Sequence, residues 1–265
     1  MKGLFQSVFG LCATLGLLCS ISAAHAEVNW ATLAPDLERA QMEISAGTLF
    51  PSQLLLIRSS LSNFRVEVIR ALDFSQPRLS VAEMCKASKA IACINANFFD
   101  EGGNALGLIV HRGIQLQDIH RGGKTLTGIF FASRENIKII PRAGYQSERV
   151  LEAVQAGPRI IHARLPVSGI ELHARSRRSG VCIDDKNRLV FYIVSSGLLG
   201  MSMEELQIAL RDPGVNCSEA LNLDGGGSSQ LYLSNKIPEA VAGLEEVSIA
   251  ARDEVPVALG LFVKE

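Results

Sequence analysis

The sequence has almost no excess of charge of either sign. Its 265 residues contain 26 Lys and Arg against 27 Asp and Glu, which gives a formal net charge of −1 at pH 7. A general nucleic-acid-binding surface needs clustered positive charge, so this balance argues against nucleic acid as a partner. Beyond the first 26 residues, no apolar run approaches the roughly 20 residues of a membrane-spanning helix. We therefore expect no membrane anchor in the mature protein.

The motifs of several common site classes are also missing. The sequence has no Gly-x-Ser-x-Gly elbow, which disfavours serine hydrolase chemistry. Its one run of three glycines lacks the lysine of a nucleotide-binding P-loop. The histidines form no His-Glu-x-x-His pair, the cysteine spacings fit no zinc site, and no loop has EF-hand spacing. No internal repeat or low-complexity linker divides the chain, so we expect one domain with a single core.

The first 26 residues have the pattern of a secretory signal peptide. Lys2 provides a positive start, residues 4–21 are mainly apolar, and Ala24-His25-Ala26 fits the small-x-small cleavage pattern. We expect residues 1–26 to be removed and the mature protein to be exported, to the periplasm or the extracellular space.

Four cysteines remain after this segment: Cys85, Cys93, Cys182 and Cys217. An even number of cysteines in an oxidising compartment favours disulfides, with buried free thiols as the alternative. Three pairings are open. We favour Cys85 with Cys93 and Cys182 with Cys217, because the first two are close neighbours in sequence.

The hydrophobic pattern predicts an α+β domain over residues 54–265, preceded by a helical lead-in over residues 27–53. Two capping boxes, Ser80 to Glu83 and Ser202 to Glu205, predict helices that run to about residues 89 and 210. We expect two or three packed helices and one mixed, mostly antiparallel sheet of about a dozen short strands. These strands are expected at residues 54–58, 64–69, 91–94, 107–110, 114–117, 128–132, 137–140, 159–162, 181–183, 189–194, 220–223, 229–233 and 257–263.

The most unusual stretch is residues 221–233, where Asp224-Gly225-Gly226-Gly227-Ser228-Ser229 separates two apolar strand-like pieces. Three consecutive glycines cost backbone entropy and contribute no side-chain packing. A hairpin turn needs only one or two of them. The third glycine suggests that something approaches the backbone closely, and a run of free N–H groups there could bind an anion. A mobile Gly-Ser turn is the alternative.

Four segments together resemble the phosphodiester glycosidase family. They are residues 95–100 followed by Gly107; Ala156-Gly157-Pro158; residues 178–181 leading into Asp184; and residues 222–229. The resemblance covers about residues 54–263. It implies hydrolysis of a sugar–phosphate diester at the sugar end, in a site built around the glycine loop. The positions that match the family's motifs are Asn95, Asp100, Arg178, Asp224, Ser228 and the three glycines.

Three of these residues are the candidate catalytic groups. Asp224 could act as base, nucleophile or metal ligand, or it could only initiate a turn. Arg178 suits a phosphate leaving group because guanidinium binds phosphate bidentately, although a solvated basic loop is the alternative. Asp100, with Glu101 beside it, is the best second carboxylate. Either of these two could bind a divalent cation, calcium or magnesium, which is the one cofactor the sequence brings into question.

Substrate contacts are expected from both sides of this site. Asn95 and Asn97 could bond sugar hydroxyls or a phosphate oxygen. The alternative for both is to cap the strand end and shape the loop, and for Asn97 the two roles are equally favoured. Asp184 is assigned to its hairpin turn. The remaining candidates for substrate binding are Gly157, Gly225, Gly226, Gly227, Ser228 and Ser229.

These observations predict an exported hydrolase that cleaves the sugar–phosphate bond of a glycosyl phosphodiester in the cell envelope or the environment. The alternative is a non-catalytic module that binds anionic or phosphorylated glycans, because the second carboxylate cannot be assigned firmly. A structural envelope protein whose glycine loop only packs is the third reading.

Overall fold

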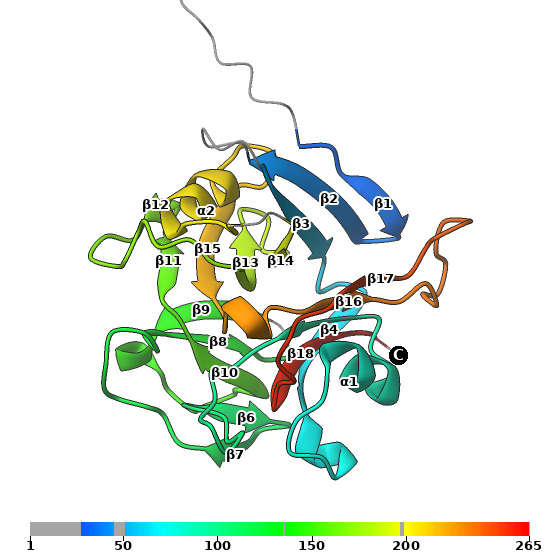
Figure 1. The fold of residues 1–265 in the computed structure, drawn as a ribbon. Coiled ribbons are helices and arrows are strands. Elements are labelled where there is room, and N and C mark those ends of the chain that lie inside the picture. Colours follow the sequence, from blue (N-terminus) through cyan, green and yellow to red (C-terminus); the bar gives the residue numbers. More distant parts are fainter. Residues whose placement is uncertain (1–27, 45–50, 135, 197–198, 265) are drawn as a thin grey trace, which may run out of the picture.

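The computed structural model describes residues 28–44, 51–134, 136–196 and 199–264 (Figure 1). The expected signal peptide, residues 1–26, lies outside the described residues. The described chain consists mainly of β-strands with two α-helices, and all of its strand pairings are antiparallel. The strands form three sheets rather than the one sheet expected from the sequence.

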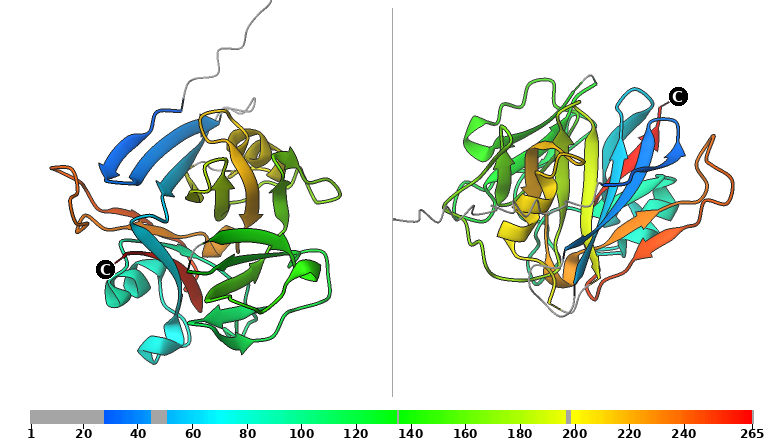
Figure 2. Two further views of the ribbon diagram at one scale, coloured as in Figure 1. Left: turned by 180° about the vertical axis from the view of Figure 1, so that it is seen from behind. Right: turned by 90° about the horizontal axis from the view of Figure 1, so that it is seen from above.

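The largest sheet has eight strands, and helix α2 (Met203–Leu210) covers part of one of its faces (Figure 2). Tyr192, Leu206 and Leu210 are fully buried between this helix and the strands. In spatial order the strands are β1 (Ala31–Ala34), β2 (Leu37–Ile44), β3 (Ser52–Ser59), β14 (Leu189–Ser196), β13 (Ser179–Asp184), β15 (Cys217–Asn222), β11 (Arg159–His162) and β12 (Leu165–Pro166).

The other two sheets have five strands each. One has the order β7 (Ile114–Gln117), β6 (Ile109–His111), β10 (Glu152–Ala156), β8 (Gly128–Ala132) and β9 (Ile137–Pro141). The other has the order β17 (Val247–Ile249), β16 (Leu231–Leu233), β5 (Ala92–Asn95), β18 (Val257–Val263) and β4 (Phe64–Arg70), with helix α1 (Val81–Ser88) packed against it.

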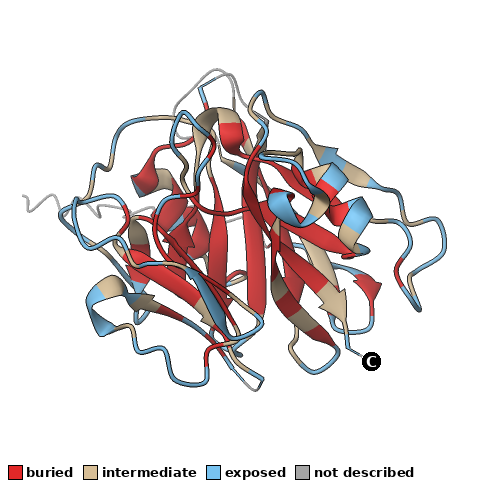
Figure 3. Ribbon diagram, turned by 90° about the horizontal axis from the view of Figure 1, so that it is seen from below, coloured by how far each residue is buried: buried red, intermediate tan, exposed pale blue. Residues whose placement is uncertain are grey.

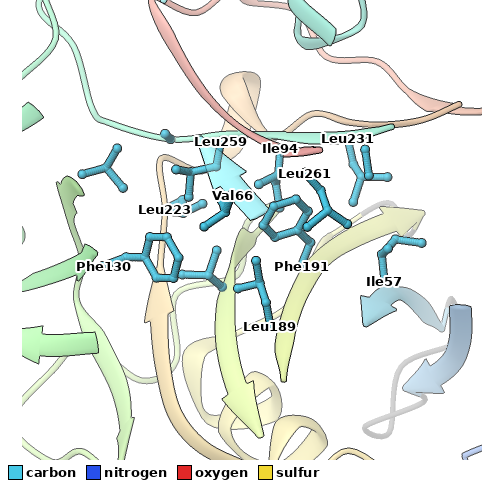
Figure 4. Packing of buried hydrophobic residues seen from close by; sticks show 14 of the residues in the cluster. Ile57, Val66, Ile94, Phe130, Leu189, Phe191, Leu223, Leu231, Leu259 and Leu261 are labelled. Atoms are coloured by element: carbon cyan, nitrogen blue, oxygen red, sulfur yellow. The ribbon is translucent and has the colours of Figure 1, made fainter. Parts of the chain in front are cut away.

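The main hydrophobic core lies where the three sheets face one another (Figures 3 and 4). Phe191 from the large sheet, Phe130 from β8 and Leu259 from β18 are at most 1% exposed and belong to one cluster. Burial of such side chains contributes about 1.5–3 kcal/mol each. This shared core fixes the ends of strands from different sheets relative to one another.

Both capping boxes are confirmed. The Ser80 side chain accepts from the Glu83 amide at 3.2 Å, while the Glu83 carboxylate accepts from the Ser80 amide at 3.0 Å. Ser202 and Glu205 form the same reciprocal pair at the start of α2. The helices therefore begin where the sequence places them.

The helical lead-in over residues 27–53 is wrong. Its described part forms β1 and β2, and β2 pairs with β3 from Leu37 opposite Ser59 to Ile44 opposite Ser52. The centre of the Trp30 ring lies 3.7 Å from the guanidinium carbon of Arg58, and the indole N–H of Trp30 donates to the carbonyl of Gly214 at 2.8 Å. Long-range pairing with β3 overrides the helical spacing of the apolar residues in this segment.

The favoured cysteine pairing is confirmed. Cys85–Cys93 and Cys182–Cys217 form disulfides with Cα–Cα distances of 5.8 and 5.9 Å. In the described part of the chain, neither α-helix is long and apolar enough to cross a membrane.

Candidate active site

The glycine loop connects two sheets. It follows β15 of the eight-stranded sheet and leads into β16 of a five-stranded sheet, with a short 3-10 turn at Gly226–Ser228 (Figure 1). The Asp224 amide donates to the carbonyl of Ala96 at 3.1 Å, just beyond the end of β5. The Leu223 amide donates to the carbonyl of Ser179 at 2.9 Å, at the start of β13. Asp224 therefore stands where the ends of three strands meet.

Asn95 holds this junction from inside. Its side chain is fully buried, its amide nitrogen donates to the Asp224 carbonyl at 2.7 Å, and its oxygen accepts from the Gln230 amide at 3.0 Å. The Ser179 hydroxyl donates to the same Asp224 carbonyl at 2.9 Å. Because both ends of the Asn95 amide are used within the protein, this residue positions the loop instead of facing a substrate.

The Asp224 carboxyl has the protonation behaviour of an acid–base group. It is half-buried and accepts hydrogen bonds from the Ser228 hydroxyl and the Gly225 amide. Burial raises its pKa from 3.8 to about 6; the negative charge of Asp253 adds to this rise and the two hydrogen bonds oppose it. A carboxyl that titrates near pH 6 can give or take a proton under physiological conditions.

The structure brings a second carboxylate, Asp253, to the loop. Its amide donates to the Gly227 carbonyl at 3.0 Å. Its two oxygens accept from Nε and Nη2 of Arg252 at 2.8 and 3.1 Å, and these bonds hold its pKa below the usual value. A Cβ on Gly227 would lie 2.1 Å from Asp253 Oδ2. Asp253 lacks a local sequence signal, because Arg252-Asp253-Glu254 looks like an ordinary charged turn.

The glycine loop does not offer a row of free amides to an anion. Gly225 donates to the Asp224 carboxyl, and Gly226 donates to the Arg177 carbonyl at 2.9 Å. The amides of Ser228 and Ser229 donate to carbonyls within the loop at 3.2 and 3.4 Å. Four of the five amides from Gly225 to Ser229 are thus used internally. A bound anion would have to rely mainly on side chains.

Arg178 stands between Arg177 and Ser179, which both bond to the loop, but its own guanidinium is directed elsewhere. The guanidinium donates to the carbonyls of Ala174 at 2.6 Å and Met201 at 3.2 Å. Within the described ranges it forms no ion pair with a carboxylate and no hydrogen bond with Asp224. Burial lowers its pKa, as expected for a cation removed from water without a counter-ion. Its neighbour Arg177 ties the loop down by donating to the carbonyls of Ser229 and Ala250 at 3.0 and 2.9 Å.

Asp100 is separate from the Asp224 site in its contacts. It is exposed, and its carboxylate accepts from the amide and side chain of Asn104 at 2.8 to 3.2 Å, which lowers its pKa. It shapes its own turn. The charge of Asp253 acts on the Asp224 carboxyl, whereas no interaction of Asp100 with Asp224 is found among the described residues, so the role of Asp100 as second carboxylate stays a prediction.

Three other predicted site residues are packed inside the protein. Asn97 is fully buried and donates to the carbonyls of Leu106, Leu108 and Gln155 at 3.2–3.3 Å. Gly157 has φ +154° and faces the Thr125 carbonyl, which would lie 2.0 Å from a Cβ there. Ser229 is fully buried, and its hydroxyl has no hydrogen-bond partner in the described chain. Asp184 binds the amides of Lys186 and Arg188, as expected for its hairpin turn.

A cavity of about 390 Å³ lies elsewhere, between β4 and the strands β8 and β9. Its lining combines apolar residues such as Phe64 and Ile137 with charged ones such as Arg65, and it does not include Asp224 or Asp253. We place the candidate site at the glycine loop, because perturbed carboxylates rather than apolar volume mark acid–base chemistry. No cluster of three His, Cys, Asp or Glu that could hold a metal ion is found in the described ranges.

Comparison with solved structures finds similar folds. The catalytic domain of zebrafish N-acetylglucosamine-1-phosphodiester alpha-N-acetylglucosaminidase, auto-inhibited by its pro-peptide, matches with 16% identity and a TM-score of 0.67, over 91% of this chain and 87% of that chain. A hypothetical protein from Synechocystis matches with 14% identity and a TM-score of 0.63, over 91% of this chain. The chain spans 65% of that Synechocystis protein, just under two thirds of its length.

A protein from Burkholderia pseudomallei, described as a candidate exported protein, matches with 13% identity and a TM-score of 0.55, over 81% of this chain and 74% of that chain. At these identities the likeness shows the fold. Comparison with curated proteins returns no match. The family model for phosphodiester glycosidases matches residues 88–264, which include Asn95, Asp224 and Asp253. That match covers more than half of the sequence, and the protein therefore belongs to the phosphodiester glycosidase family.

Proposed function

We propose that the protein is a hydrolase that cleaves the bond between the sugar and the phosphate of a glycosyl phosphodiester. The observation that carries this proposal is the Asp224 carboxyl on the glycine loop. Burial raises its pKa to about 6, and the loop lies within the residues that the family model matches. The zebrafish relative is named for an N-acetylglucosamine-1-phosphodiester. We therefore take glycosyl phosphodiesters, and those of N-acetylglucosamine first, as the substrate class.

In this proposal Asp224 acts at the glycosidic bond. Phosphate is already a good leaving group, so the bridging oxygen needs only modest acid assistance, and stabilisation of developing negative charge matters more. Arg178 remains our candidate for holding the phosphate. Its half-buried guanidinium has no carboxylate partner within the described chain, and a phosphate would compete for it with the carbonyls of Ala174 and Met201.

We also propose that the mature protein acts outside the cytoplasm. Two observations support this proposal. Residues 1–26 have the pattern of a signal peptide, and the protein has two disulfides, which persist in oxidising compartments. The substrate would then be a component of the cell envelope or of the surroundings.

The test is turnover by the purified protein on a panel of α- and β-linked sugar phosphodiesters, with and without added divalent cation. Free sugar should be released, and Asp224→Asn should lower kcat by about 10²–10⁴-fold, the usual contribution of an acid–base group. Arg178→Met should raise KM for the phosphodiester. Asp118→Asn, which neutralises an exposed carboxylate, is the matched control and should retain full activity.

No turnover on the whole panel would reject the hydrolase. Tight binding without turnover, unchanged by Asp224→Asn, would instead support the glycan-binding module.

A further inference from the structure

We propose that Asp253 is the second catalytic carboxylate, the base that takes a proton from the water attacking the sugar while Asp224 acts on the departing phosphate. This inference rests on the proposed function. It assigns the partner of Asp224 to a residue 29 positions further along the chain, on the segment that precedes β18.

The Asp253 carboxylate lies directly against the glycine loop. A Cβ added at Gly227 would be 2.1 Å from Asp253 Oδ2 and 2.8 Å from Arg252 Nη2. Any side chain at position 227 would therefore displace this carboxylate. The third glycine of the run thus allows a carboxylate to lie against the backbone, three residues from Asp224.

A chain of buried amides joins the two aspartates. Asn95 donates to the Asp224 carbonyl at 2.7 Å and accepts from the Gln230 amide at 3.0 Å. The Gln230 side chain then donates to the Asp253 carbonyl at 2.7 Å and accepts from the Val81 amide at 3.1 Å. Both Asn95 and Gln230 are at most 3% exposed. One rigid connection therefore fixes the backbones of both aspartates.

The pKa values of the two carboxyls are shifted in opposite directions. Arg252 binds both oxygens of Asp253, and the charge of Arg78 also favours its ionised form. Burial and the negative charge of Asp253 raise the pKa of Asp224 to about 6, so its carboxyl still carries a proton near that pH. A pair of carboxyls whose environments separate their pKa values is the arrangement that supplies one acid and one base. The Asp253 side chain is 35% exposed, so water can reach it.

The reaction balances with these two groups. The oxygen of one water molecule forms a bond to the anomeric carbon, and a proton of that water passes to the Asp253 carboxylate. The bond between the anomeric carbon and the bridging oxygen breaks, its electron pair stays on the phosphate, and Asp224 donates its proton to that oxygen. The products are the free sugar and a phosphate monoester. Proton exchange with solvent then restores Asp224 to its acid form and Asp253 to its carboxylate form.

The experiment uses the mature protein and a sugar phosphodiester that the unaltered protein hydrolyses. Asp253→Ala and Asp253→Asn are compared with Glu254→Gln, a neighbouring exposed carboxylate that serves as control. We expect kcat to fall by at least about 10²-fold in both Asp253 variants, with KM changed less than threefold. Glu254→Gln should be unchanged. Asp253→Asn retains the shape of the side chain, and its thermal unfolding shows whether the fold is kept.

Azide separates a catalytic role from a structural one. Azide attacks the anomeric carbon without a base, so it should raise the rate of Asp253→Ala at least tenfold and yield a glycosyl azide, detected by mass spectrometry. Proton NMR should show that the unaltered enzyme releases sugar of inverted configuration, because water activated by a base attacks opposite the leaving phosphate.

Normal kcat in both Asp253 variants, loss of activity that azide does not restore, or retained configuration would each overturn the role of Asp253. An unaltered protein that hydrolyses no phosphodiester would reject the proposed function instead.

Discussion

The stability of this protein should depend on pH through Asp224, and Asp224→Asn should remove that dependence. Burial raises the pKa of Asp224 from 3.8 to about 6, so the folded protein binds this proton more tightly than the unfolded chain does. The contribution of this bound proton to the free energy of unfolding is therefore fully present below about pH 4, and it is lost as the pH rises through about 6. Above that pH, the folded state carries an ionised carboxylate that it disfavours.

The magnitude follows from the size of this pKa change. A change of the pKa from 3.8 to about 6 corresponds to a change of about 3 kcal/mol at most in the free energy of unfolding. Asp224 is only half-buried, and solvent screening reduces the expected effect to about 2 kcal/mol. Asparagine keeps an acceptor for Ser228 or Gly225 without the charge. The catalytic carboxyl thus lowers stability at neutral pH, as is common for groups in active sites.

Thermal unfolding of both proteins between pH 4 and pH 8 measures this difference. We expect Asp224→Asn to equal the unaltered protein, or to fall below it, at pH 4, and to unfold about 4–8 °C higher at pH 8. Asp118→Asn, an exposed carboxylate, should show no such trend. If the difference between Asp224→Asn and the unaltered protein is the same at every pH, the Asp224 carboxyl does not titrate as its burial requires, and the reasoning is refuted.

Three further predictions concern the supports of the site. Gly227→Ala should displace the second carboxylate and lower kcat at least tenfold, whereas Gly144→Ala, whose nearest contact would be 3.7 Å away, should have no effect; equal activity of the two would be contrary evidence. Asn95→Ala removes two buried hydrogen bonds and should cost about 2–4 kcal/mol of unfolding free energy in urea, together with most of the activity; a loss under about 0.5 kcal/mol would show that the bonds matter little. Replacing Cys182 and Cys217 by alanine opens a loop of 35 residues and should cost about 4 kcal/mol by the same urea measurement, a figure that unchanged stability would disprove.

Local features of the fold could be predicted from the sequence. The capping boxes at Ser80 and Ser202 begin the two helices, because the signal lies within four consecutive residues. The strand expected at residues 64–69 is confirmed as β4, because apolar and charged residues alternate from Phe64 onward as in a half-buried strand. The helix predicted for the N-terminal segment is wrong. Its strands form by pairing with β3, and the spacing of apolar residues within the segment cannot reveal that partner.

The candidate site divides in the same way. Asp224 and its glycines were identifiable, since three consecutive glycines are unusual and must have a spatial reason. That reason could not be read from the sequence, because Asp253 comes from a distant turn and meets Gly227 only in the folded chain. The sequence leaves two roles open for Asn95, substrate contact or shaping of the strand end. Its burial and its bonds to Asp224 and Gln230, which favour the second role, exist only in the folded chain.

The most direct test of the account is the site of bond cleavage. A sugar phosphodiester hydrolysed in water enriched in ¹⁸O should give free sugar that carries the label at its anomeric oxygen, and a phosphate monoester without label, because attack occurs at carbon. Mass spectrometry of both products measures this distribution. Label in the phosphate monoester would show attack at phosphorus and would contradict a glycosidase acting through Asp224.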